Sequence, residues 1–76
     1  MHELIRTNDV VLLSYVQSLL QEAGIEYLLL DGHMSVLDGS IGAIPRRLLV
    51  DEDHNLKARR LLRDHGLGHE LRDDRP

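Results

Sequence analysis

The sequence lacks several residue types and patterns, and each absence excludes a class of protein. It has no cysteine, so it can form neither a disulfide framework nor a thiolate metal site. No apolar run approaches the roughly 18 residues that a membrane-spanning helix needs. The first residues, Met1-His2-Glu3, lack the basic start and apolar stretch of a signal peptide. We therefore expect a cytoplasmic protein that does not associate with membranes.

Aromatic residues are also scarce, because phenylalanine and tryptophan are absent and tyrosine appears twice. A sheet that binds RNA needs aromatic side chains on which bases can stack. The net charge of −4 also disfavours nonspecific contact with nucleic acid. We expect no nucleic-acid partner. The basic residues are concentrated in residues 46–63, and this stretch is where an anionic partner could bind.

What is present is a balanced composition, with 42% hydrophobic and 29% charged residues in a chain of 76. These values are typical of one small globular domain. We assign this domain to residues 1–67. Residues 68–76 form a polar C-terminal tail, which could either add a short fourth strand at a sheet edge or be disordered.

The first half of the chain predicts a strand followed by a helix. The strand covers residues 2–6, and the helix covers residues 9–23, where apolar residues recur at spacings of three and four. Asn8 is the predicted N-cap of this helix, because its side-chain oxygen can accept a free backbone N–H. Gly24 is placed to end the helix in a left-handed conformation.

The second half predicts two strands and a second helix. The strands cover residues 26–30 and 46–50, and the helix follows the second of them and ends at Gly66. Arg59 and Arg63 lie four residues apart on this helix. We expect them on its solvated outer face, since charged residues usually occupy that position.

The order strand, helix, strand, strand, helix in so short a chain predicts an α+β fold. The compact solution is a ferredoxin-like split β-α-β sandwich, with both helices on one face of an antiparallel sheet. The strand over residues 46–50 would then lie between the other two.

The predicted sheet has an unusual second face. The strand segments 27–30 and 48–50 are apolar at every position, whereas a sheet with one face in water should alternate. We infer that the second face is covered, and we expect a homo-oligomer that forms through this free sheet face. The long loop and the tail are the alternative covers.

The connection between these strands, residues 31–45, contains three glycines and is long for so small a domain. Its backbone N–H groups, with the arginines that follow, could bind an anion. The glycine spacing fits neither a Walker A loop nor a dinucleotide-binding fingerprint, and the glycines could also serve turn geometry alone. The candidate ligand- or partner-binding residues are Met34, Ser35, Gly39, Ser40, Ile41, Gly42, Arg46 and Arg47.

We assign no catalytic residue and no metal ligand. None of the serines lies in a Gly-x-Ser-x-Gly turn. His65 and His69 are four residues apart, but Gly66 and Gly68 interrupt the helix that they would need in order to share a face. We therefore expect neither a cofactor nor an enzyme.

Four stretches carry a resemblance to a known family: Arg6-Thr7-Asn8-Asp9, Glu22-Ala23-Gly24-Ile25, residues 34–47 and Ala58-Arg59-Arg60-Leu61-Leu62. They resemble a small bacterial family of putative prokaryotic signal-transducing proteins, which is grouped with PII-like, ferredoxin-like domains. The resemblance covers about residues 2–67. It implies that the loop binds an effector or partner and that protomers associate through their sheets, as in PII-like proteins. It carries over no catalytic residue.

We therefore expect a non-enzymatic regulatory or signal-transducing module, whose 31–47 segment recognises a protein partner or a small anionic metabolite. The alternative is a structural or scaffold domain that oligomerises and has no small ligand. A third class, a small phosphoryl- or acyl-transfer enzyme, would need a cleft that places Ser35 or Ser40 near His33.

Overall fold

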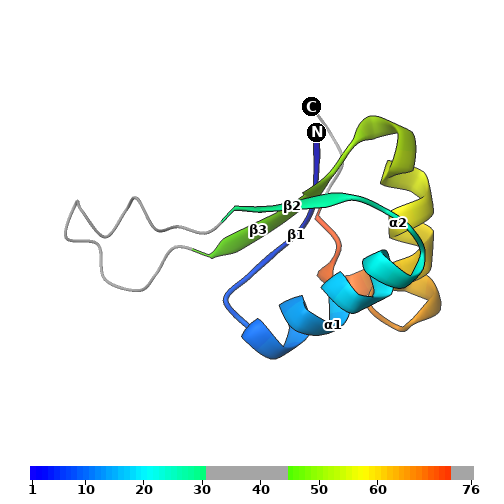
Figure 1. Ribbon diagram of the computed structural model, residues 1–76. Coiled ribbons are helices and arrows are strands. Elements are labelled where there is room, and N and C mark those ends of the chain that lie inside the picture. The colour runs from blue at the N-terminus through cyan, green and yellow to red at the C-terminus, as the bar shows by residue number, and fades with distance from the viewer. Residues whose placement is uncertain (31–44, 73–76) are drawn as a thin grey trace.

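The computed structural model describes residues 1–30 and 45–72, and these residues form an α+β fold with two helices and a three-stranded antiparallel sheet (Figure 1). The three predicted strands and the first predicted helix have bounds within one residue of those observed. The elements in chain order are β1 (His2–Thr7), α1 (Val10–Glu22), β2 (Tyr27–Leu30), β3 (Arg46–Val50), α2 (Glu52–Asp64) and a short 3-10 helix, η2 (Gly68–Glu70).

The sheet has β3 in the middle, as predicted, and β3 pairs antiparallel with both β1 and β2. Its pairing with β2 is regular over the whole strand. Its pairing with β1 contains a β-bulge between Glu3 and Ile5. A bulge inserts one unpaired residue and turns the strand locally. The inserted residue is Leu4, and both Leu4 and Ile5 are buried as a result.

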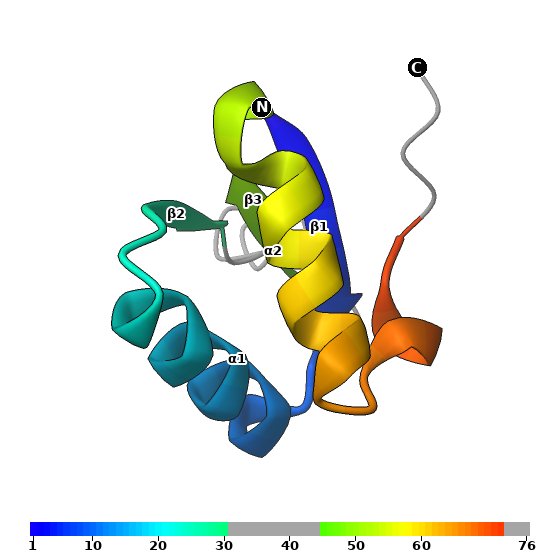
Figure 2. The same ribbon diagram turned by 90° about the vertical axis from the view of Figure 1, so that its right-hand side faces the viewer.

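The core lies between the sheet and the two helices, which lie on the same side of the sheet (Figure 2). The side chains of Ile5, Leu48 and Val50 point from the sheet into this core and are almost fully buried. Removing such aliphatic surface from water is the main stabilising term for a domain of this kind. The helices and the α1–β2 connection contribute Leu13, Val16, Leu19, Leu20, Ile25, Ala58 and Leu62.

The N-cap of α1 is Asp9, and the prediction of Asn8 is wrong. The Asp9 carboxylate accepts the backbone N–H groups of Val11 and Leu12, at 3.0 and 3.1 Å. The Thr7 hydroxyl accepts the Asp9 N–H at 3.1 Å, while Asp9 itself has extended backbone angles. Both residue types cap helices well, so the geometry of the exit from β1 decides which one does so.

The C-terminal end of α1 has the predicted glycine. Gly24 has a φ of +72°, and the N–H of Ile25 donates to the carbonyl of Leu20 at 2.9 Å. This bond is the mark of a Schellman motif, in which the buried apolar pair also closes over the helix end. Gly66, with a φ of +77°, ends α2 in the same way.

The start of α2 is fixed by Asp51, whose carboxylate accepts the backbone N–H of His54 at 3.2 Å. The same carboxylate oxygen lies 2.6 Å from Nδ1 of the His54 ring. The hydrogen bond from the His54 side chain lowers the pKa of Asp51 below its ordinary value. The carboxylate therefore stays ionised and keeps capping the helix into the acid range.

The described part of the tail, residues 68–72, folds back on the edge of β1 that faces away from β3. After η2, Leu71 forms an isolated antiparallel bridge with Ile5, and the N–H of Arg72 donates to the Leu4 carbonyl at 2.9 Å. The sequence left two alternatives for the tail, a short fourth strand or disorder. In residues 68–72 the structure has a 3-10 turn and a single β-bridge.

Candidate functional site

Of the eight predicted binding residues, the structure describes Arg46 and Arg47, which open β3 directly after the loop. The other six lie outside the described residues: Met34, Ser35, Gly39, Ser40, Ile41 and Gly42.

Arg46 and Arg47 point to opposite faces of the sheet, because successive side chains of a strand alternate. Arg46 is half-buried and shares its face with Leu48 in the core. Arg47 is exposed on the other face, which we call the outer face. The two arginines therefore do not form one cluster, and Arg47 is the one that an external ligand can reach.

Arg47 has a second arginine directly opposite it. The register pairs Arg47 with Arg6 of β1 on one side and with Leu30 of β2 on the other. Side chains directly opposite in an antiparallel pair have Cβ atoms about 4.5–5.5 Å apart, and like charges in that position are destabilising. The end of β1 and the start of β3 therefore carry an unfavourable pair of cations, Arg6 and Arg47.

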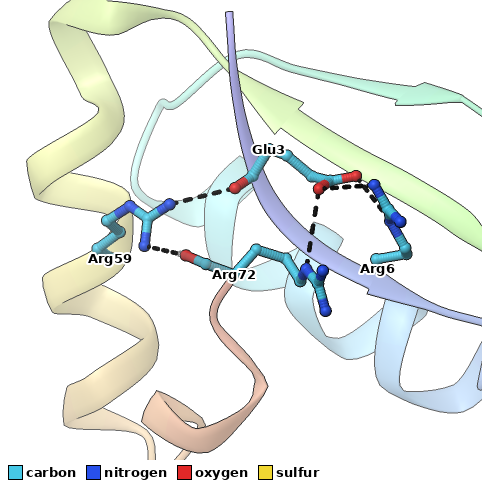
Figure 3. Close-up of polar contacts among 4 residues, drawn as sticks. All are labelled: Glu3, Arg6, Arg59 and Arg72. Atoms are coloured by element: carbon cyan, nitrogen blue, oxygen red, sulfur yellow. Dashed lines mark hydrogen bonds and ion pairs between the residues drawn. The ribbon is translucent and has the colours of Figure 1, made fainter. Parts of the chain in front are cut away.

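Glu3 offsets one of these charges (Figure 3). Its carboxylate accepts two hydrogen bonds from Arg6, at 3.0 and 3.1 Å, and lies 3.8 Å from Nε of Arg72. Arg6 is thus held by a bidentate pair, which is the stronger geometry for a guanidinium and a carboxylate. Within residues 1–30 and 45–72 no hydrogen bond or ion pair holds Arg47.

The rest of the outer face is apolar. Leu28 and Leu49 are directly opposite each other, and Leu30 lies beside Arg47. Leu28 is 43% exposed, whereas Leu49 and Leu30 are half-buried. Three leucines bordered by arginines thus form a mixed apolar and cationic surface. That a second copy covers this face stays a prediction.

Arg59 is not on the solvated face of α2, and the sequence prediction for this residue is wrong. Its side chain is 5% exposed. It donates to the carbonyls of Glu3 (3.1 Å) and Arg72 (2.7 Å), and to Oδ1 of Asn55 (3.0 Å). A buried guanidinium is tolerated only when its donors are satisfied, and Figure 3 shows it reaching from α2 to β1 and the tail together. Charge spacing along one helix gave no signal for these contacts.

In the described part of the chain, no three His, Asp or Glu side chains are grouped so that they could hold a metal ion. Neither α1 nor α2 has the length and apolar character of a helix that crosses a membrane.

Two comparisons with known proteins bear on this arrangement. A family model described as putative prokaryotic signal transducing protein matches residues 1–66. The match spans both helices and all three strands and stops before η2. A search of curated proteins finds no match.

Proposed function

The chain belongs to the family described as putative prokaryotic signal transducing protein, and from this premise we propose that it is a non-enzymatic, cytoplasmic regulatory module. In this proposal the 31–47 segment and the outer face bind a partner or metabolite through its anionic group, a carboxylate or a phosphate. The fold would be ferredoxin-like, and the loop would serve as the recognition loop that the PII-like resemblance implies.

The observation that carries this proposal is the cross-strand pair of Arg6 and Arg47. Two like charges directly opposite weaken a sheet, and of these two arginines Glu3 holds Arg6 and not Arg47. An anion beside Arg47 would turn this local cost into binding energy, because guanidinium groups bind carboxylates and phosphates with charge-assisted hydrogen bonds.

The test is an amide NMR titration of the labelled protein with nucleotides, phosphorylated metabolites, 2-oxo acids and an acidic peptide. We expect saturable shifts at Arg47, Arg6 and Leu30, at the mouth of the loop. Arg47→Ala should weaken binding about tenfold or more, since a hydrogen bond to a charged group contributes about 1.5–3 kcal/mol. The separate arms of the panel distinguish a small metabolite from a protein partner.

Arg60→Ala is the matched control. Arg60 is exposed on α2, so this substitution removes the same charge from a different surface of the molecule. If Arg60→Ala weakens binding as much as Arg47→Ala, the attraction is nonspecific and the assigned site is wrong. A well-dispersed spectrum without shifts would favour the second candidate.

The second candidate is a scaffold domain that oligomerises without a small ligand. The apolar residues Leu28 and Leu49 on the outer face favour it, because exposed apolar patches mark protein contacts. The residues that a small phosphoryl- or acyl-transfer enzyme would use, His33, Ser35 and Ser40, lie outside the described residues.

A further inference from the structure

The two edges of the sheet differ in whether other parts of the described chain cover them. β1 forms one edge and β2 forms the other. An unpaired edge presents a row of backbone N–H and C=O groups, and proteins usually block it. We infer that β2 is an association edge, where a second copy of this chain pairs through its own β2.

The β1 edge is blocked by several independent contacts. Leu71 bridges to Ile5, and the N–H of Arg72 donates to the Leu4 carbonyl. The buried Arg59 side chain holds this tail in place through the Arg72 carbonyl. A β-bulge also distorts this strand, which is a further way of preventing edge pairing.

The β2 edge has none of these devices in the described part of the chain. No helix, strand or backbone hydrogen bond from residues 1–30 or 45–72 occupies the side of β2 that faces away from β3 (Figures 1 and 2). The strand contains no proline, no charged residue and no bulge. Its two central residues are exposed on opposite faces, Leu28 at 43% and Leu29 at 36%.

The occupant follows from the chemistry of the strand. An added strand must place apolar side chains beside Leu28 and Leu30 on the outer face, and beside Tyr27 and Leu29 on the core face. β2 itself is such a strand. It is also neutral, so two copies meet without the repulsion that the arginines of the outer face would cause in face-to-face stacking.

The geometry of this pairing is restricted. When two identical strands pair antiparallel and keep their core faces on one side, one residue must lie opposite its own copy. The pairing joins two three-stranded sheets into one of six strands, and it makes the leucines of the two outer faces continuous. The registers centred on Leu28 or on Leu29 pair the most residues of β2, so we place one of these two leucines on the two-fold axis.

The first test compares the same substitution at two neighbouring positions. Leu28→Lys places a charge at the edge, whereas Leu49→Lys places it on the central strand, directly opposite Leu28 and on the same face. In sedimentation velocity over a range of concentrations, we expect a dimer that Leu28→Lys weakens about tenfold or more and Leu49→Lys leaves largely intact. Circular dichroism checks that both variants are folded.

The second test uses the absence of cysteine and does not depend on a charged variant. A single cysteine in place of Leu28 or of Leu29 should give covalent dimers with a short bismaleimide. Val11→Cys, on the outward side of α1 where Val11 is 75% exposed, should not.

Three results would overturn the inference: a monomer at every concentration, equal dissociation by Leu28→Lys and Leu49→Lys, or cross-linking at position 11 as rapid as at 28 and 29. Equal dissociation would assign the contact to the outer face instead. The inference does not depend on anion binding, since Arg47 lies on the central strand and not on the β2 edge. Arg47→Ala should therefore leave the dimer unchanged.

Discussion

Arg59 shows how much one side chain can contribute to a small domain. Its guanidinium connects three parts of the chain, namely α2, the bulge of β1 and the tail. The carbonyls of Glu3 and Arg72 receive its hydrogen bonds, so its removal would leave acceptors without their charged donor. Such a loss is more costly than the loss of an exposed ion pair.

Replacing Arg59 by methionine should therefore lower the free energy of unfolding by about 2–3 kcal/mol. Arg59→Lys should recover only part of this, because an ammonium group cannot reproduce the planar arrangement of donors. Urea denaturation measures both variants. Arg60→Met, at an exposed position of the same helix, should change stability by less than about 0.5 kcal/mol; an equal loss there would show that helix propensity, not the contacts of Arg59, is responsible.

At the scale of the element, each helix is set by its first and last residues. α1 and α2 both begin at an aspartate whose side chain accepts a backbone N–H and both end at a glycine with positive φ. These signals are local in sequence, and for that reason the helix ends could be predicted with small errors. The error at Asn8 arose because two residues that can cap a helix are adjacent, and it is the Asp9 carboxylate that accepts the N–H groups of the first turn.

The corrected cap gives a direct comparison. Asp9→Ala should lower the free energy of unfolding by about 1 kcal/mol, because two N–H groups of the first turn lose their acceptor. Asn8→Ala should have little effect, since Asn8 has no role in the cap. Thermal unfolding of the two variants, followed by circular dichroism, measures the difference. A larger loss for Asn8→Ala would restore the original prediction.

At the scale of the whole molecule, the sequence did not predict the contacts that join separate elements. The helices, the strands and the central position of β3 follow from periodicity, turn residues and chain length. The burial of Arg59 depends on Arg72 and Glu3, which lie outside α2 and have no sequence pattern linking them to it. For the binding site, the sequence selected Arg47 but missed Arg6, because only the register of β1 and β3 brings them together.

The family match stops at residue 66. The contacts of Leu71 and Arg72 nevertheless predict that the tail contributes to the stability of the domain. Shortening the chain to residues 1–67 should lower the free energy of unfolding by about 2 kcal/mol or more, since the bridge of Leu71 and the hydrogen bonds of Arg72 are removed. When the truncation is combined with Arg59→Met, the free energy of unfolding should fall by less than the sum of the two separate losses, because both changes remove the same hydrogen bond. Full additivity in denaturant unfolding would show that Arg59 and the tail act independently.

The bond between Arg72 and the Leu4 carbonyl also has a kinetic consequence. A ribosome releases β1 and β3 before it releases Arg72, so β1 can already be paired with β3 while its other edge is still unprotected. Contacts between residues so distant in sequence form slowly, since the chain must first close a long loop. Nascent chains on neighbouring ribosomes should therefore be most prone to aggregation in the interval that ends when the tail covers β1.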